Sequence, residues 1–377
     1  MDISRHIIPE IYNYDNKIKE IDTYRILNNV DIEKVHKHTS ILYKPSLERN
    51  ILYIPNHYKN FMITIELSGV IDIELDSPIL EDCSFIIEYD KYKFNSLKCM
   101  ERLINFLKLL PANTKSINIS SICSSDIQQD IIQYLPRNLK KYYTLENYIE
   151  SLDNLPPSLE FLSVYPANVD YSYAYLPLTL HTLDIRGSIA LPELANLPHG
   201  LKVLSLDYYN HNLATLPVGL EKLIITNYRN LDTCTELGDI PPNLKTLQFC
   251  SWNEHTIDDR GCVKKPSKCP ENGIKEYPMG LEHLDIDYKV DIAKLPPTLK
   301  SLGLYGFDLS SNIIELPENI TTIYTNDDYI EYLPSHIKRV IIINTGDCCS
   351  VNSARVRVGD VIFEMSTYNI AECFMIN

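Results

Sequence analysis

A motif that recurs along most of this chain restricts the folds that the sequence can adopt. In its clearest copy, which starts at Leu155, it reads Leu-Pro-Pro-Ser-Leu-Glu-Phe-Leu-Ser-Val, so the frame is L-P-x-x-L-x-x-L-x-L. Strong copies begin at Leu155, Leu176, Leu197, Leu216, Ile240, Tyr277, Leu295, Leu316 and Leu333, and weaker copies begin at Ile54, Leu110 and Leu135. Repetition at about 20 to 25 residues is typical of solenoids, in which each coil stacks on the next.

The second half of the frame alternates apolar and polar positions, which predicts a short strand. In the copy at Leu197 we expect Leu204 and Leu206 to face the core, and Val203, Ser205 and Asp207 to face outward. The lead proline fixes φ and lacks an N–H, so it suits the entry to a turn and not a paired ladder. The pattern therefore predicts parallel strands that form the concave wall of a curved solenoid.

The segments that return from one strand to the next are short. About ten residues remain in most coils, too few for a full helix, so we expect extended or 3₁₀ segments on the convex side. Three early segments have apolar residues at helical spacing. We predict short convex helices there, at Met100 to Leu110, Asp126 to Leu135 and Leu145 to Leu152.

The segment at residues 1–50 precedes the repeats and contains short helical patterns. We predict a helical cap that covers the first coil. The stretch Ile8-Pro9-Glu10-Ile11 resembles the opening of an F-box, a helical module that docks onto ubiquitin-ligase scaffolds. The alternative to a cap is therefore a docking module.

Residues 51–345 form the predicted solenoid, whose early strands we place at Met62 to Leu67 and Ser84 to Tyr89. Residues 346–377 leave the frame, and Val356 to Glu364 read as a β-hairpin. We predict a C-terminal β cap, because a terminal coil must cover its open apolar end.

Charge and composition limit the partners. The formal net charge is −15 at pH 7, which disfavours nucleic acid and anionic membranes, since both are bound through clustered Lys and Arg. No apolar run approaches the ~20 residues of a membrane helix, and the start of the chain has no signal-peptide pattern. The ten cysteines lack a framework spacing and predict reduced thiols. We expect a soluble, cytoplasmic protein without a cofactor.

The longest interval between lead prolines holds an insert at residues 250–277, which contains Trp252, the only tryptophan. Insertions in solenoid repeats map to one face, often the binding face, so we predict that Trp252 contacts a partner. The alternative is a tryptophan that packs on its neighbours.

The insert also holds Cys250, His255, Cys262 and Cys269, which are zinc-type ligands. No C-x-x-C pair is present and the spacings match no closed zinc motif. We therefore predict no metal here, and either a staple within the loop or free thiols.

Equivalent positions of adjacent strands lie about 4.8 Å apart and form rows across the concave face. These rows mix aromatic, acidic and basic side chains on a rigid wall, which suits protein recognition. The predicted contact residues are Tyr165, Asp184, Arg186, Asp207, Gln248, His283, Asp285, Asp287, Tyr305 and Tyr324. The alternatives are a solvated acidic face and an ion pair between Arg186 and Asp207.

A Ser-His-Asp triad can be drawn from neighbouring row positions, with Ser301, His283 and Asp285. An open strand surface does not exclude water and offers no oxyanion donors. We therefore predict that the protein is not an enzyme.

Over residues 100–345, the frame resembles the leucine-rich repeats of two groups. One comprises secreted bacterial effectors, and the other comprises the leucine-rich and FNIP-type repeat proteins of social amoebae and amoeba-infecting giant viruses. The effectors follow their repeats with a ligase domain that has a C-x-D motif, which is absent here, as is the F-N-x-P-I element. Both resemblances imply a curved α/β-type leucine-rich-repeat solenoid that binds another protein without catalysis. The alternatives are a substrate-recognition adaptor of a ubiquitin ligase and a structural or virion scaffold component.

Overall fold

The structure is a computed structural model in which most of the repeat array is described. It describes residues 40–43, 51–52, 62–66, 74–75, 84–88, 96–120, 131–149, 152, 154–166, 175–186, 191, 193–194, 196–207, 209, 211–226, 239–250, 274, 276–286, 290–303, 316–325, 333–344, 355–358 and 361–367. The protein divides into two compact units, Met1–Gly187 and Ser188–Asn377, and the boundary falls inside the repeat array.

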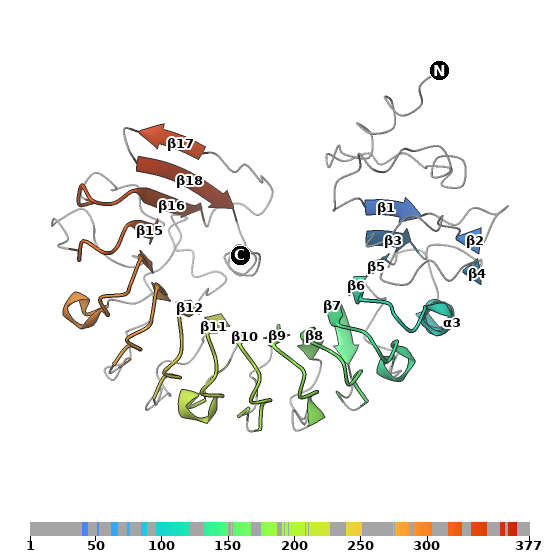
Figure 1. The fold of residues 1–377 in the computed structure, drawn as a ribbon. Coiled ribbons are helices and arrows are strands. Elements are labelled where there is room, and N and C mark those ends of the chain that lie inside the picture. Colours follow the sequence, from blue (N-terminus) through green and yellow to red (C-terminus); the bar gives the residue numbers. More distant parts are fainter. Residues whose placement is uncertain are drawn as a thin grey trace, which may run out of the picture. The chain divides into compact units, whose positions relative to one another are not determined.

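The first unit is built on a parallel sheet with the order β1-β3-β5-β6-β7-β8-β9, beside a small β2-β4 pair (Figure 1). Its strands are β1 Ser40–Tyr43, β2 Ile51–Leu52, β3 Met62–Glu66, β4 Glu74–Leu75, β5 Ser84–Glu88, β6 Ser116–Ser120, β7 Lys141–Ile149, β8 Phe161–Pro166 and β9 Thr182–Ile185. The strands predicted from Met62 and from Ser84 are confirmed as β3 and β5.

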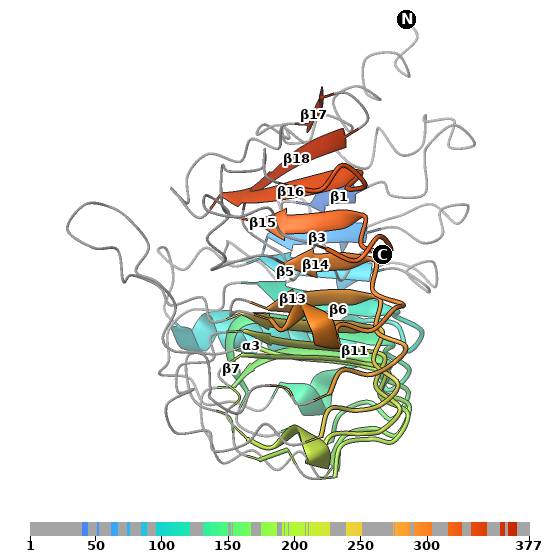
Figure 2. The same cartoon turned by 90° about the vertical axis from the view of Figure 1, so that its left-hand side faces the viewer.

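The second unit continues the same pattern, with the order β10-β11-β12-β13-β14-β15-β16-β18-β17. Its strands are β10 Val203–Asp207, β11 Lys222–Thr226, β12 Thr246–Cys250, β13 His283–Ile286, β14 Ser301–Gly303, β15 Thr322–Thr325, β16 Arg339–Asn344, β17 Arg355–Val358 and β18 Val361–Thr367. Figure 2 shows the strands from β13 to β18 stacked side by side. Each unit is a parallel-stranded leucine-rich-repeat solenoid, the fold class predicted from the sequence.

The lead proline of each frame begins a tight turn. The N–H of Leu159 donates to the carbonyl of Pro156 at 3.1 Å, and the same bond recurs from the coil of Pro136 to that of Pro334. The next two N–H groups, of Glu160 and Phe161, both donate to the carbonyl of Lys140 in the preceding coil. The turn therefore fixes the residue at which each strand begins to pair with the sheet.

The leucines of the frame form the core of both units. The second apolar position is completely buried in nine coils, at Leu139, Leu159, Leu180, Leu201, Leu220, Leu244, Leu281, Leu299 and Ile320. Burial of one such side chain contributes about 1.5–3 kcal/mol, so the stacked ladder supplies most of the driving force for folding. As predicted, Leu204 and Leu206 are buried, but Ser205 between them is buried as well.

The convex side carries one α-helix and several 3₁₀ turns in the described ranges. The helix predicted at Met100 to Leu110 is confirmed as α3, Ser96–Leu109, whose Phe106 packs edge-on against Phe85 of β5. The 3₁₀ turns are η3 Ile132–Tyr134, η5 Leu213–Thr215 and η6 Ile292–Lys294. Of the helix predicted at Asp126 to Leu135, residues 126–130 lie outside the described residues, and η3 follows them.

The helix predicted at Leu145 to Leu152 is wrong, because β7 continues to Ile149. After a register shift beyond Tyr143, Tyr148 pairs with Tyr165 and Ile149 with Pro166 of β8. A short isolated helix is marginal in water, whereas this segment gains a neighbouring strand and contains aromatic and β-branched residues that favour strands.

The ends of the array differ from the predicted boundaries in one respect. Ser40–Tyr43 pairs in parallel with β3, so the sheet begins inside the segment 1–50. At the other end, β17 and β18 pair antiparallel, as the predicted hairpin requires, and β18 pairs with β16. Residues 1–39 lie outside the described residues, and the two cap assignments stay predictions. Among the described residues, no helix is both long and apolar enough to cross a membrane.

Candidate functional site

The outward residues of the strands form three rows in each unit, which together we call the strand face. In the second unit the start row runs from Val203 through Lys222, Thr246, His283, Ser301 and Thr322 to Arg339, and each step is a register pair. The central row includes Ser205, Ile224, Gln248 and Asp285. The last row includes Asp207, Thr226 and Cys250. The sequence spacing placed these residues correctly in rows.

Most of the central row is buried, apart from half-buried side chains such as Tyr143 and Tyr324, and this corrects the expected exposure of three predicted contact residues. Asp184 and Gln248 are each 1% exposed and Asp285 is 3% exposed. Each side chain of the central row lies about 4.8 Å from the equivalent side chains of the two neighbouring strands. Because the sheet curves toward this side, the ends of these side chains lie closer still and cover one another. These three side chains therefore lie below the exposed surface and are not themselves accessible to a partner.

In the first unit, buried Asp184 holds Arg186 in place. Asp184 Oδ2 accepts a hydrogen bond from Ser163 Oγ of the neighbouring strand and another from Arg186 Nε, each at 2.8 Å. Arg186 retains 30% side-chain exposure. Because Nε is bonded to Asp184, the guanidinium is oriented, and its terminal nitrogens are the part available to a carboxylate or carbonyl oxygen.

An aromatic pair lies on the strands that precede Asp184. The rings of Tyr143 in β7 and Phe161 in β8 have centroids 4.4 Å apart and an interplanar angle of 32°. Both side chains are half-buried, and burial raises the pKa of Tyr143. The predicted contact residues did not include this pair, because nothing in the sequence spacing shows that two rings in different rows will touch.

In the second unit, a histidine and a serine join β13 to β14. His283 Nδ1 lies 2.6 Å from Ser301 Oγ. Burial lowers the pKa of His283, the Glu282 carboxylate opposes that shift, and Lys300 and Lys222 reinforce it. Ser301 is only 2% exposed, so its hydroxyl is a poor candidate nucleophile. The geometry suits a bridge between strands better than a catalytic dyad.

Some of the remaining predicted residues lie in the described strands, and the others lie outside the described ranges. Asp207 accepts a hydrogen bond from the Thr226 hydroxyl, and Tyr324 is a half-buried side chain of β15. The structure describes Tyr165 only as part of β8 and Cys250 only as the end of β12. The residues outside the described ranges are Trp252, His255, Cys262, Cys269, Asp287 and Tyr305.

Within the described ranges, no group of three or more His, Cys, Asp or Glu side chains is placed to hold a metal ion. The four candidate ligands of the insert are not tested by this finding, because three of them lie outside those ranges.

Comparisons with known proteins add little to this description. No protein-family model matches the sequence, and no similar protein was found among curated sequences. Among solved structures, the protein is similar to YopM from Yersinia enterocolitica WA-314, with 19% sequence identity and a TM-score of 0.36, over 78% of this chain and 68% of that chain. So weak a similarity identifies no function, and the function is inferred from the residues of the strand face.

Proposed function

We propose that this protein is a non-enzymatic protein-binding module whose strand face recognises another protein through the Tyr143, Phe161 and Arg186 side chains. The observation that carries the proposal is the buried Asp184 carboxylate, which holds Arg186 at the surface. A buried, hydrogen-bonded carboxylate beneath an exposed arginine orients the cation before any partner arrives, which reduces the entropy that binding must lose.

The three side chains have complementary roles. The Tyr143–Phe161 pair offers a rigid apolar surface. Arg186, which directly follows the adjacent strand β9, offers its guanidinium. Arginine and aromatic residues dominate binding energy at protein interfaces, and guanidinium groups favour carboxylates. We expect the partner to present an Asp or Glu side chain, or a terminal carboxylate, next to an apolar residue.

The test is selection of peptides from a random display library on the full-length protein, followed by affinity measurements on individual sequences. We expect the selected peptides to be enriched in an acidic residue beside an aromatic or aliphatic one. Arg186→Ala should weaken their binding by about tenfold or more, which is the loss of at least 1.4 kcal/mol expected for an interface anchor.

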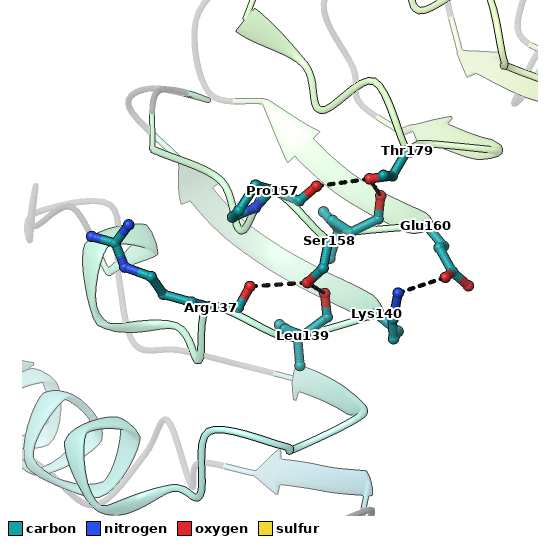
Figure 3. Close-up of polar contacts among 8 residues, drawn as sticks. Arg137, Leu139, Lys140, Pro157, Ser158, Glu160 and Thr179 are labelled. Atoms are coloured by element: carbon teal, nitrogen blue, oxygen red, sulfur yellow. Dashed lines mark hydrogen bonds and ion pairs between the residues drawn. The ribbon is translucent and has the colours of Figure 1, made fainter.

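Arg137→Ala is the matched control, because Arg137 is an exposed arginine at a turn of the same unit (Figure 3). It should leave the affinities unchanged. Peptides that bind wild type and Arg186→Ala equally, or a library without any selected sequence, would contradict the proposal.

We also propose the broader interactions that the sequence predicts. The 250–277 insert, with Trp252, is a second proposed contact region. The adaptor alternative depends on residues 1–50, of which the structure describes Ser40–Tyr43 as strand β1. The scaffold alternative and the cytoplasmic location are proposals from the sequence alone.

A further inference from the structure

Four consecutive coils of the second unit present an apolar side chain and a charged side chain at the same two turn positions. The apolar residue follows the lead proline, and the charged residue lies three positions later. The pairs are Val218 with Glu221, Pro242 with Lys245, Met279 with Glu282, and Pro297 with Lys300. We call these residues the turn stripe.

The apolar half of the turn stripe faces solvent. Val218 and Met279 are each 70% exposed, and Pro242 and Pro297 are exposed as well. Single apolar residues on a surface are ordinary, but a row at one position of four stacked coils makes a continuous patch. Nothing in the core requires these residues, because the leucines of the same coils are already buried.

The turn stripe is also held rigidly. The carbonyl of each charged residue accepts two N–H groups of the next coil, as Glu221 O does from Lys245 and Thr246. Between the turns, Asn243 Nδ2 donates to the Val218 carbonyl at 3.0 Å and Thr298 Oγ1 donates to the Met279 carbonyl at 2.7 Å. A patch fixed in this way loses little conformational entropy when it is covered.

The charges of the turn stripe alternate in sign along the coils. Lys245 pairs with Glu221 at 2.8 Å, and Lys300 pairs with Glu282 at 2.6 Å. A lysine has three donors and a carboxylate about four acceptor sites, so these side chains can each bond a further group. A second stripe in parallel, coil on coil, would set like charges opposite each other. A second stripe in antiparallel order sets every charge opposite its counterpart.

We propose that the turn stripe binds the turn stripe of a second copy of this protein, antiparallel, about a two-fold axis between the Pro242 and Met279 coils. Glu221 then faces Lys300 of the second copy, and Lys245 faces Glu282 of the second copy. The apolar residues meet along the middle, and the contact is isologous and closed. Four coils cover far less than the ~800 Å² per partner of a standard interface, so the dimer is weak and reversible.

The decisive experiment is a charge exchange followed by analytical ultracentrifugation of the full-length protein. One variant, E221K/E282K, carries four lysines in the stripe, and the other, K245E/K300E, carries four glutamates. Wild type should dimerise with a Kd between about 1 μM and 1 mM. Each variant alone should be monomeric, and an equimolar mixture should form the dimer again.

The mixture separates association from folding. Both variants lose the Glu221–Lys245 and Glu282–Lys300 ion pairs within one molecule, and mixing cannot restore them. Met279→Ser should weaken the wild-type dimer, whereas Leu178→Ser should not. Leu178 is 83% exposed at the same turn position of the first unit, outside the stripe. Wild type that stays monomeric up to about 1 mM, a mixture that stays monomeric, or species larger than a dimer would overturn the proposal.

Discussion

The residue before the second leucine of each frame decides how one turn bonds to the turn before it. The hydroxyl of Ser158 and that of Thr179 each lie within hydrogen-bond distance of two carbonyls of the preceding coil, which share its single donor (Figure 3). The Thr298 hydroxyl is placed in the same way. Asn243 and Asn319 each donate to one such carbonyl. These bonds satisfy carbonyl groups at the exposed edge of the stack that the strand ladder does not reach.

Gly280 occupies this position without a side chain, which allows a direct prediction. A Cβ added there meets nothing within 4 Å, so a serine fits without a clash. We expect its hydroxyl to bond the preceding coil as that of Thr298 does. We expect Gly280→Ser to raise the free energy of unfolding by about 1 kcal/mol, from one hydrogen bond and a less flexible unfolded state. Urea denaturation measures the change.

Gly219 provides the control at the same position of another coil. A Cβ there lies 3.3 Å from the His199 carbonyl oxygen, so Gly219→Ser should gain less than Gly280→Ser. Equal gains at both positions, or a loss at Gly280, would contradict the assigned role of this turn position.

Between elements, the contact of β13 with β14 depends on His283 and Ser301, and it makes stability depend on pH. Because burial lowers the pKa of His283 in the folded protein, the unfolded protein takes up the proton at a higher pH. Protonation therefore favours unfolding. The contribution of His283 is complete above its ordinary pKa of 6.5 and is lost as the pH falls from there toward the folded-state pKa.

We predict that wild type loses stability between about pH 7 and pH 5, and that His283→Gln removes this loss while it can still bond Ser301. Denaturation across a pH series measures it. Lysine partners lower the pKa of Glu160, Glu221 and Glu282, so their contributions are lost only below the ordinary glutamate pKa of 4.5. If the free energy of unfolding of His283→Gln falls between pH 7 and pH 5 as steeply as that of wild type, the assignment to His283 is wrong.

At the scale of the whole molecule, each coil contacts mainly the coils before and after it, as the strand pairing shows. Stability in such an array is close to a sum of coil terms and nearest-neighbour terms. Energetic coupling between two sites should therefore decay within one or two coils of the same unit.

A double-mutant cycle tests this property with four buried leucines of the second unit. Leu223 and Leu247 are register neighbours, so Leu223→Ala with Leu247→Ala should show coupling of about 0.5–3 kcal/mol. Leu204 and Leu302 lie four strands apart, and their alanine variants should add within about 0.5 kcal/mol. Strong coupling of the distant pair, measured by urea denaturation, would show that the unit does not behave as a linear array.

The features that repeat could be predicted from the amino-acid sequence. The spacing from each lead proline predicted the strand starts, the leucine ladder and the rows of the strand face, because each depends only on a coil and its nearest copy. The hairpin and the 3₁₀ returns followed from local turn signals and segment length. Residue types in the rows, including Asp184 and Arg186, were therefore assigned to the correct face.

Which of those outward residues meet solvent could be learned only from the packing of the coils in three dimensions. The curve of the sheet buries Asp184, Gln248 and Asp285, and the β7 register shift replaces a predicted helix with a strand. The contact of Tyr143 with Phe161 and the exposed apolar turn positions have the same origin. Each depends on distances between side chains of different coils, which a period along the sequence does not contain.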